Sequence, residues 1–136
     1  LYVVQLLIDT QILIWFQLGH SQLNPIVSEL LSDRSNEIYV SDISLYEITI
    51  KQTIGKLNEL SVNIEDIMSV AKQDDFQFLP VTHKQLQNYR AVPLFPTHRD
   101  PFDRLIISVS KTENLPLISA DIKFDLYKDF IQLIKA

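Results

Sequence analysis

The stretch VVQLLIDTQILIWFQL (residues 3–18) passes from a short apolar run, across Asp9 and Thr10, into a second apolar run. The first run, Val3 to Ile8, has the length of a strand and predicts one that is buried on both faces. The opening LYVVQLLID is too short to span a bilayer and has no basic leader, so we interpret it as part of that strand. Gln11 to Leu18 predicts a helix. A buried strand that leads directly into a helix indicates an α/β fold.

The same alternation of short apolar runs and amphipathic segments continues along the chain. Further strands are predicted at Ile38–Val40, Phe78–Leu79, Leu117–Ile118 and Ile131–Ile134. Further helices are predicted at Pro25–Arg34, from Ser41 or Asp42 to Ile54, and at Ile64–Lys72, Thr82–Tyr89 and Pro101–Glu113. This order predicts a mainly parallel sheet with helices on both faces. With 136 residues and no internal repeat, the chain is expected to form one domain over residues 1–136.

Charge and composition restrict the class of function. Lys and Arg total 12 against 17 Asp and Glu, which gives a net charge of -5. This is the wrong sign for a protein that binds nucleic acid by bulk electrostatic attraction, so such a partner would require a local basic rim or bound cations. The absence of cysteine excludes a disulfide framework and thiolate chemistry. We expect a cytoplasmic protein that does not associate with membranes.

Aspartates stand at the points where predicted strands and loops lead into helices. Asp9 follows the first strand and Asp121 follows the apolar run LPLIS, so both should lie at the carboxyl edge of the sheet, where parallel sheets bind ligands. Each has a simpler explanation, because an aspartate in this position often caps the helix. In THRDPFDRLIIS (residues 97–108), Asp100 as N-cap and Asp103 in the first turn also make a favourable helix start. Capping could therefore explain these residues without a function.

Glu47 is harder to explain as a structural residue. At about 100° per residue, an apolar stripe runs along the predicted helix through Ile43, Tyr46, Ile50, Ile54 and Leu57. Glu47 falls within this stripe, and a carboxylate that faces the core is costly unless it is paired or coordinates a metal. The alternative is an ion pair with Lys51, one turn later, which is worth about 0.2 to 0.5 kcal/mol on a helix surface. That energy is small compensation for burial.

Four blocks of the sequence together resemble one known family. They are LLIDTQILIW (residues 6–15), SLYEITIKQTIGKL (44–57), THRDPFDRLIIS (97–108) and LPLISADIKF (115–124). The blocks resemble the signature segments of PIN-domain proteins, and most of all those of VapC-like toxins. The resemblance extends from Leu6 to about Tyr127, nearly the whole chain, and the blocks follow the family's order. The joint pattern is far more specific than any single aspartate.

This resemblance implies a fold, a chemistry and a set of acids. The implied fold is a three-layer α/β sandwich, and the implied activity is RNA cleavage in an acidic pocket that binds Mg²⁺ or Mn²⁺. The family's acids fall on Asp9, Glu47, Asp103 and Asp121, which are therefore the expected metal ligands and catalytic residues. Asp100 occupies an additional acidic position of the branch with the HxDPFDR pattern, and we assign it a supporting role.

The departures from the family pattern are mild. Gln11 stands where this branch often has histidine, and Tyr46 stands where tryptophan is common, so substrate contacts near these two residues are the least certain part of the resemblance. Trp15 and Phe16 belong to a strongly apolar helix and are expected in the core or in a subunit interface rather than as platforms for stacking bases.

The chemistry of the acids agrees with this assignment. Several carboxylates brought together repel one another, and hard oxygen ligands without cysteine favour Mg²⁺ or Mn²⁺ over Zn²⁺. Lys51, His98, Arg99 and Arg104 are the candidates for a basic rim that holds the RNA backbone. Two of them have structural alternatives, because Arg104 could pair with Asp100 and His98 could form hydrogen bonds within its loop.

Other functions were weighed against a metal-dependent endoribonuclease. A receiver-like regulator that accepts a phosphoryl group usually has a pair of acids after its first strand, and Asp9 is single. A haloacid-dehalogenase-like phosphatase would need an aspartate at Gln11. A PIN domain that serves only as a binding module stays open as an alternative, although no acid is missing. The resemblance also implies a small antitoxin partner and a toxin homodimer.

Overall fold

The computed structural model describes residues 3–136, so Leu1 and Tyr2 of the predicted opening strand lie outside the described residues. Within this range the chain forms a five-stranded sheet in which every neighbouring pair of strands is parallel. The strands are β1 (Gln5–Ile8), β2 (Glu37–Ser41), β3 (Gln77–Leu79), β4 (Leu117–Ser119) and β5 (Leu133–Lys135). Their order across the sheet is β3-β2-β1-β4-β5, which places the first strand in the centre.

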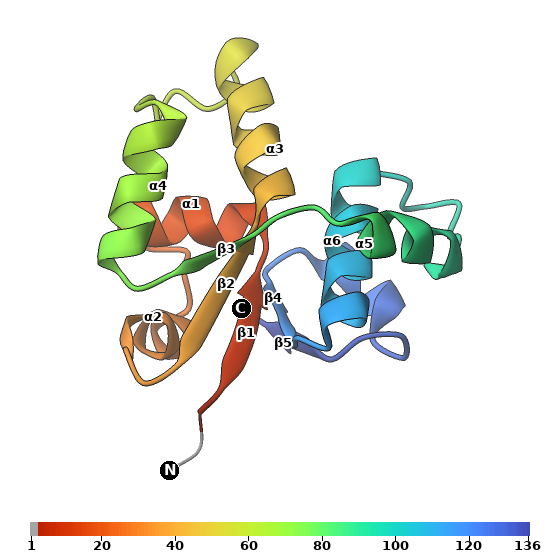
Figure 1. Ribbon diagram of the computed structural model, residues 1–136. Helices are drawn as coiled ribbons and strands as arrows, with labels where there is room; N and C mark the ends of the chain where they lie inside the picture. Colours follow the sequence, from red (N-terminus) through yellow and green to blue (C-terminus); the bar gives the residue numbers. More distant parts are fainter. Residues whose placement is uncertain (1–2) are drawn as a thin grey trace.

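Helices cover both faces of the sheet and complete the predicted three-layer α/β sandwich (Figure 1). The α-helices are α1 (Thr10–Leu18), α2 (Pro25–Ser32), α3 (Asp42–Thr53), α4 (Ile64–Gln73), α5 (His83–Asn88) and α6 (Pro101–Glu113). Two 3₁₀ helices, η1 (Tyr89–Ala91) and η2 (Ile122–Tyr127), follow α5 and β4. Helices α1, α2 and α4 lie on one side of the sheet, and α5 and α6 lie on the other. None of the helices within residues 3–136 is both long and apolar enough to cross a membrane.

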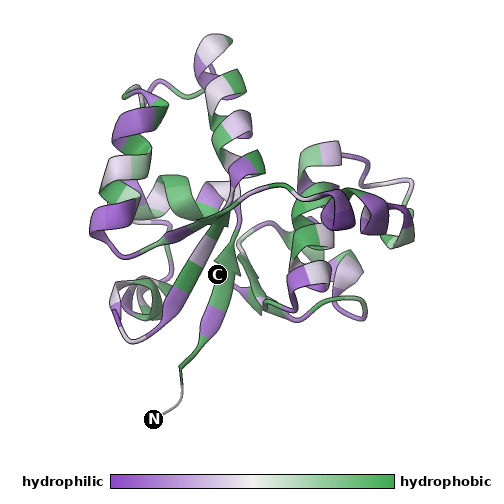
Figure 2. Ribbon diagram, in the orientation of Figure 1, coloured by the Kyte–Doolittle hydropathy of each residue, from purple (hydrophilic) through white to green (hydrophobic). Residues whose placement is uncertain are grey.

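The central strand separates two hydrophobic clusters because its side chains alternate between the faces. Leu6 and Ile8 pack into the cluster that α1, α2 and α4 close, and Leu7 packs into the cluster beneath α6. All three side chains are at most 1% exposed. Figure 2 shows the same distribution, with apolar residues concentrated on the central strands and on the helix faces that cover them. Burial on both faces explains why β1 is apolar at consecutive positions and does not alternate with polar residues.

The predicted elements are confirmed, with differences at their ends. The first strand begins at Gln5 rather than at Val3, and the last strand is Leu133–Lys135 rather than Ile131–Ile134. Helix α2 ends at Ser32, two residues before the predicted end at Arg34. The short helix η2 was not predicted, since its six residues are too few to show a helical period. Helix α6 has the predicted bounds, because Asp100 caps it and Pro101 occupies its first position.

The predicted core-facing stripe of α3 was wrong. The buried residues of this helix are Ser44, Leu45 and Ile48, whereas Tyr46 and Ile54 are 59% and 58% exposed. Helix α3 starts at the carboxyl end of β2 and extends beyond the sheet, where it contacts α1 and α6 (Figure 1). The face that packs is set by these two neighbours and includes a serine, so the apolar residues alone did not identify it.

Candidate active site

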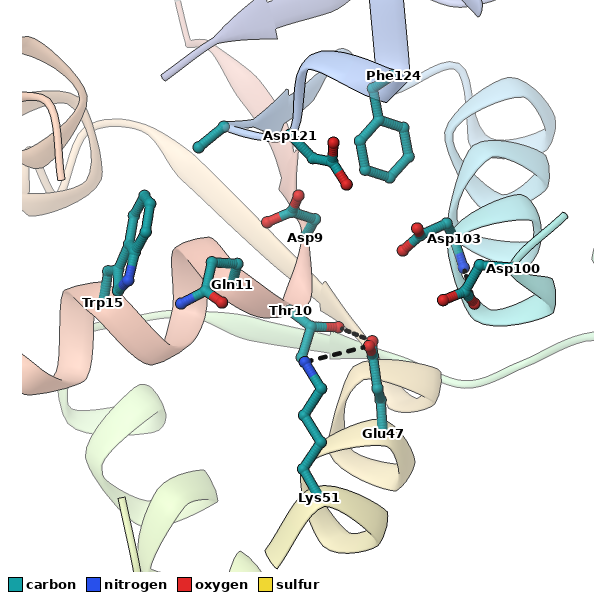
Figure 3. A pocket seen from close by; sticks show the side chains of 11 residues that line it. Asp9, Thr10, Gln11, Trp15, Glu47, Lys51, Asp100, Asp103, Asp121 and Phe124 are labelled. Atoms are coloured by element: carbon teal, nitrogen blue, oxygen red, sulfur yellow. Dashed lines mark hydrogen bonds and ion pairs between the residues drawn. The ribbon is translucent and has the colours of Figure 1, made fainter. Parts of the chain in front are cut away.

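A cavity of about 310 Å³ opens at the carboxyl edge of the sheet, where β1 and β4 lie side by side. Its lining residues are Asp9, Thr10, Gln11, Trp15, Glu47, Lys51, Asp100, Asp103, Ala120, Asp121 and Phe124. The lining therefore includes all five acids that the sequence singled out. They come from separate parts of the chain and surround one space (Figure 3). The edge is the one at which parallel sheets bind ligands.

Asp9 follows directly after β1 and is both a helix cap and a pocket residue. Its carboxylate accepts a hydrogen bond of 2.9 Å from the Ile12 amide and so caps α1. The residue is only 4% exposed because strands flank it on both sides. The capping explanation is therefore correct, but it does not account for a carboxylate that is buried in a cavity with other acids.

Asp103 enters the pocket from the first turn of α6. Its Oδ2 lies 3.0 Å from Nε2 of His98, and its side chain is 20% exposed. Asp100, three residues earlier, accepts hydrogen bonds from the amides of Phe102 (2.8 Å) and Asp103 (3.3 Å). Asp100 is therefore the N-cap that the sequence predicted, and it lines the same cavity from an exposed position.

Asp121 lines the pocket from a position two residues after the end of β4. Its carboxylate accepts a hydrogen bond of 2.9 Å from the Lys123 amide and caps η2. Its own amide donates to the Ser119 hydroxyl at 3.1 Å. Like Asp100, Asp121 is exposed. We call Asp9 and Asp103 the inner carboxylates, and Asp100 and Asp121 the outer carboxylates.

Glu47 reaches the pocket from the middle of α3, where it forms the predicted ion pair and also lines the cavity. Its side chain is 13% exposed and its Oε2 lies 3.5 Å from Nζ of Lys51, which is the ion pair that the sequence suggested. Its Oε1 also accepts a hydrogen bond of 2.6 Å from the hydroxyl of Thr10. Glu47 is thus anchored to α1 and faces the same cavity as the inner carboxylates (Figure 3).

Burial and mutual repulsion perturb the inner carboxylates. Desolvation is the main cause that raises the pKa of Asp9 from 3.8 to about 6, and the charges of Asp103 and Glu47 raise it further against the hydrogen bonds from Ser119 and Ile12. Desolvation likewise raises the pKa of Asp103 to about 6, opposed by the hydrogen bond to His98 and assisted by the charges of Asp100 and Glu47. The pocket therefore contains negative charge that the protein does not compensate.

The four basic residues that were predicted to contact RNA differ in their exposure to solvent. Lys51 lines the pocket, and Arg99 is exposed. His98 and Arg104 are only 4% and 5% exposed, so their predicted place in a basic rim was wrong. The prediction that His98 forms hydrogen bonds is confirmed, but the partners of its two ring nitrogens, Tyr127 and Asp103, lie outside its loop.

Arg104 has a structural role that differs from the predicted pair with Asp100. Its guanidinium donates to the carbonyl oxygens of Pro93 (2.6 Å) and Val92 (3.1 Å) and lies 5.1 Å from the centre of the Tyr89 ring. No ion pair joins Arg104 to Asp100 within residues 3–136. Arg104 therefore fastens the proline-rich loop at residues 91–96 to α6.

Several residues of the site were missed by sequence reasoning. The Thr10 hydroxyl lies within hydrogen-bond distance of both Glu47 and Ser44, and the Tyr127 hydroxyl contacts His98. The position of Thr10 directly after Asp9 was a signal that could have been used. Trp15 was expected in the core or in an interface, and it packs against the core cluster, but it is only half-buried. It also lines the pocket and stacks on His20 with ring centres 5.7 Å apart.

The donor set fits a hard divalent cation. All five acids offer carboxylate oxygens, the ligands that Mg²⁺ and Mn²⁺ prefer, and their uncompensated charge is what such a cation would neutralise. Within residues 3–136, no three histidine or acidic side chains converge closely enough to hold an ion in their present conformations. Binding would therefore require at least some of the carboxylates to turn toward the others.

The architecture is that of VapC toxins in solved VapBC toxin–antitoxin complexes. VapBC2 from Rickettsia felis, bound to a DNA fragment from their promoter, gives a TM-score of 0.71 at 20% identity over 97% of this chain and 98% of that chain. VapBC-5 from Mycobacterium tuberculosis gives 0.68 at 16% identity over 98% and 99%. DNA-bound VapBC from Salmonella typhimurium gives 0.64 at 15% identity over 98% of each chain. At these identities the likeness shows the fold.

Similarity in sequence identifies the family. No curated protein matches the chain significantly. The family model described as "PIN domain" matches residues 6–129, which include all five acids of the pocket and all but the last of the five strands. The chain therefore belongs to the PIN-domain family.

Proposed function

We propose that this PIN-domain protein is an endoribonuclease that requires Mg²⁺ or Mn²⁺ and that acts as the toxin of a toxin–antitoxin pair. The observation that carries the proposal is the pair of inner carboxylates, which face one cavity and whose pKa values are both raised to about 6. Burial and mutual repulsion both raise the free energy of the two ionised carboxylates, and the net effect is a raised pKa in spite of their hydrogen bonds. Perturbed acids in a cleft are typical of a functional site.

The acids of the pocket have distinct parts in this proposal. Asp9 and Asp103 are the direct metal ligands, and Glu47 and Asp121 complete the site. A bound Mg²⁺ or Mn²⁺ supplies an activated water and stabilises the charge that develops on the scissile phosphate. Asp100 keeps its cap on α6 and supports the site from the rim.

The remaining pocket residues are suited to hold the RNA strand. Lys51, whose side chain is 35% exposed, lies beside Glu47 and can reach a phosphate at the mouth of the pocket. Arg99 offers a second cation on the loop that leads into α6. These two residues are the basic rim of the proposal, since His98 and Arg104 are buried. A chain with a net charge of -5 must rely on such local contacts.

The partners follow from the neighbours. The similar structures are VapBC assemblies, which contain an antitoxin beside the toxin. We assign this chain a small antitoxin that blocks the acidic pocket, a homodimeric toxin core and a place in the cytoplasm. The competing function is a PIN domain that binds but does not cleave, and no replaced acid supports it. Family membership removes the receiver-like alternative.

One assay tests the proposal. The purified full chain is incubated with a structured RNA in Mg²⁺ or Mn²⁺, with and without excess chelator, and the products are resolved on a denaturing gel. We expect internal cleavage that the chelator stops. Mn²⁺ binding is measured in parallel by calorimetry. Binding of Mn²⁺ without cleavage of any of several folded RNAs would favour the binding module over the nuclease.

A further inference from the structure

The Asp103 carboxylate contacts a buried side chain that is itself hydrogen-bonded to a second buried side chain. Its Oδ2 lies 3.0 Å from Nε2 of His98, and Nδ1 of the same ring lies 2.7 Å from the hydroxyl of Tyr127. Tyr127 is fully buried, and His98 is 4% exposed. The three groups therefore form a continuous chain of hydrogen bonds that starts in the core beneath α6 and ends at the pocket.

The chemistry of the three groups fixes the direction of these hydrogen bonds. An ionised carboxylate can only accept, so Nε2 of His98 must carry the proton that it donates to Asp103. In a neutral ring Nδ1 is then an acceptor, and the Tyr127 O–H must be the donor to it. With a neutral ring and an ionised Asp103, the geometry thus selects the tautomer of His98 that is protonated at Nε2.

The imidazole of His98 is fixed in place by its surroundings. The ring packs edge-on against Phe124 at 5.8 Å and against Tyr127 at 5.4 Å, measured between ring centres. Its backbone amide donates to the Phe95 carbonyl oxygen at 3.1 Å, which closes the turn before α6. A ring held by aromatic contacts and by hydrogen bonds on both nitrogens cannot rotate freely, so the oxygen that it contacts is also held.

We propose that Tyr127 and His98 are positioning residues that orient the Asp103 carboxylate for divalent cation binding. Committing Oδ2 to His98 leaves Oδ1 as the oxygen available to an ion, and the rotation of the carboxylate is settled before the ion arrives. Hydrogen bonds of this kind to a ligating group usually decide how well it binds. This inference rests on the proposed function, because it assigns Asp103 to the metal site.

The tautomer is the first test, and it requires neither metal nor RNA. A ¹H–¹⁵N correlation spectrum of the imidazoles is recorded on the full chain in chelator, and His98→Gln identifies the His98 signals among the three histidines of the chain. We expect His98 to be protonated at Nε2 with a bare Nδ1. A ring protonated at Nδ1 would overturn the relay, because Tyr127 would then accept and Asp103 would lose its donor.

The second test is the dissociation constant for Mn²⁺, measured by calorimetry on matched variants. Tyr127→Phe keeps the buried ring and removes only the hydroxyl, and we expect about fivefold weaker binding. His98→Leu removes both hydrogen bonds at similar volume and should weaken binding about tenfold or more. His98→Gln retains an amide N–H near the position of Nε2 and should bind within about twofold of the wild type.

A control separates a local effect from a general loss of stability. Tyr39→Phe removes a tyrosine hydroxyl that lies outside the pocket, where it is partly buried and donates to the Glu37 carboxylate at 3.0 Å. It should leave the Mn²⁺ affinity unchanged. Thermal melts in chelator report the stability of each variant. A Tyr127→Phe protein that melts lower but binds Mn²⁺ as well as the wild type would show that the hydroxyl only stabilises the fold, and would overturn the proposal.

The outcomes distinguish a failure of the proposed nuclease function from a failure of the positioning role of His98 and Tyr127. If the wild type binds Mn²⁺ and His98→Leu binds it equally well, the relay is wrong and the metal-dependent nuclease stands. If the wild type binds no Mn²⁺, the proposed function fails, and the positioning role fails with it. Weaker binding in Tyr127→Phe and His98→Leu, with affinity retained in His98→Gln, supports both.

Discussion

Asp9 and Asp121 begin from the same local design and end in different environments. Each follows one of two neighbouring parallel strands, and each caps the next helix through a 2.9 Å hydrogen bond. Asp9 is 4% exposed and its pKa is raised to about 6, whereas Asp121 is exposed. The cap is a property of the local sequence. The raised pKa comes from the burial of Asp9 directly after the central strand, whereas Asp121 lies two residues beyond β4 and is exposed although β1 and β5 flank that strand.

Asp103 and Asp100 repeat this contrast within one helix turn. Asp100 forms the cap of α6 at an exposed position, and Asp103 points inward and meets His98. The inner carboxylates are therefore alike in their burial, although Asp9 follows a strand and Asp103 lies in a helix. Removing the charge of an inner carboxylate should therefore have large effects on RNA cleavage and on the free energy of unfolding. Removing the charge of an outer carboxylate should have small effects on both.

The largest expected effect is on RNA cleavage by variants of the inner carboxylates. Asp9→Asn and Asp103→Asn keep the shape of each side chain but remove a direct metal ligand. We expect cleavage to fall about a thousandfold or more, equivalent to about 4 kcal/mol of transition-state stabilisation. Initial rates on one RNA substrate measure this. Asp66→Asn, in the exposed first turn of α4, is the control and should cleave like the wild type. Full activity in both inner variants would end the metal-nuclease assignment.

The next effect is on stability without metal and has a defined sign. The folded-state pKa of Asp9 is about 6 against 3.8, so the folded protein holds that proton more tightly than the unfolded chain does. Its contribution to the free energy of unfolding therefore decreases as pH rises from about 4 to about 6. Asp9→Asn should remove this decrease and raise the stability at pH 7 by up to about 3 kcal/mol, since one pKa unit corresponds to about 1.4 kcal/mol. The asparagine can still accept from Ile12 and keep the cap.

Urea unfolding at pH 4 and pH 7, in chelator, measures this difference. Asp121→Asn is the matched control, because it is also a helix cap after a strand but is exposed. Its unfolding free energy should show the same dependence on pH as the wild type. An Asp9→Asn protein that loses as much stability as the wild type between the two pH values would contradict the contrast between inner and outer carboxylates.

The outer carboxylates should have a smaller effect on cleavage. Asp100→Asn and Asp121→Asn preserve the capping oxygen, and we expect each variant to retain about a tenth of the wild-type rate or more, in line with groups that support a metal site from outside. The informative comparison is between Asp100→Asn and Asp103→Asn at equal protein concentration. If Asp103→Asn were the more active of the two, the roles of cap and ligand would have to be exchanged.

The smallest effect is expected for Glu47 in the absence of metal. Glu47→Gln keeps an oxygen for the Thr10 hydroxyl and loses the attraction of Lys51, which is worth about 0.2 to 0.5 kcal/mol. It also relieves the repulsion that Glu47 exerts on Asp9 and Asp103. The melting stability in chelator should therefore be unchanged, within about 0.5 kcal/mol, or slightly higher.

Mn²⁺ provides the second arm of the Glu47 experiment. At about a hundred times its dissociation constant, a single bound ion adds about 2.7 kcal/mol to the stability of the wild type. Glu47→Gln should lose part of this gain. A variant that is less stable than the wild type in chelator, yet gains as much from Mn²⁺, would remove Glu47 from the site.

Much of this architecture could be predicted because its signals are local. The bounds of α6 follow from Asp100 and Pro101 at its start, and the sheet follows from short apolar runs between helices. Four acids of the pocket, Asp9, Asp100, Asp103 and Asp121, lie at strand ends and helix starts that can be located in a sequence, and parallel strands bring those ends to one edge. Glu47 lies in the middle of a helix and was placed with them by the family resemblance. The sequence marks each of these acids separately, and the parallel topology of the sheet brings them to the same pocket.

The features that were missed depend on contacts between distant segments. His98 and Tyr127 are 29 residues apart, and nothing in either segment marks them as partners. The guanidinium of Arg104 satisfies two backbone carbonyls of a loop whose path the sequence does not specify. The buried face of α3 centres on Ser44 because that small side chain meets Thr10 of α1, which no count of apolar residues reveals. Burial and pairing of this kind are tertiary properties.

The strand order has a consequence for the stage of synthesis at which the pocket can form. The central strand β1 is translated before the other four strands, but the strand that pairs with its other side, β4, ends at Ser119. Until that segment has been translated, β4 does not enclose Asp9 and Asp121 is missing from the pocket. Contacts between segments that lie far apart in the sequence form late in folding. The pocket of a nascent chain therefore lacks one of its walls until β4 and Asp121 have been translated.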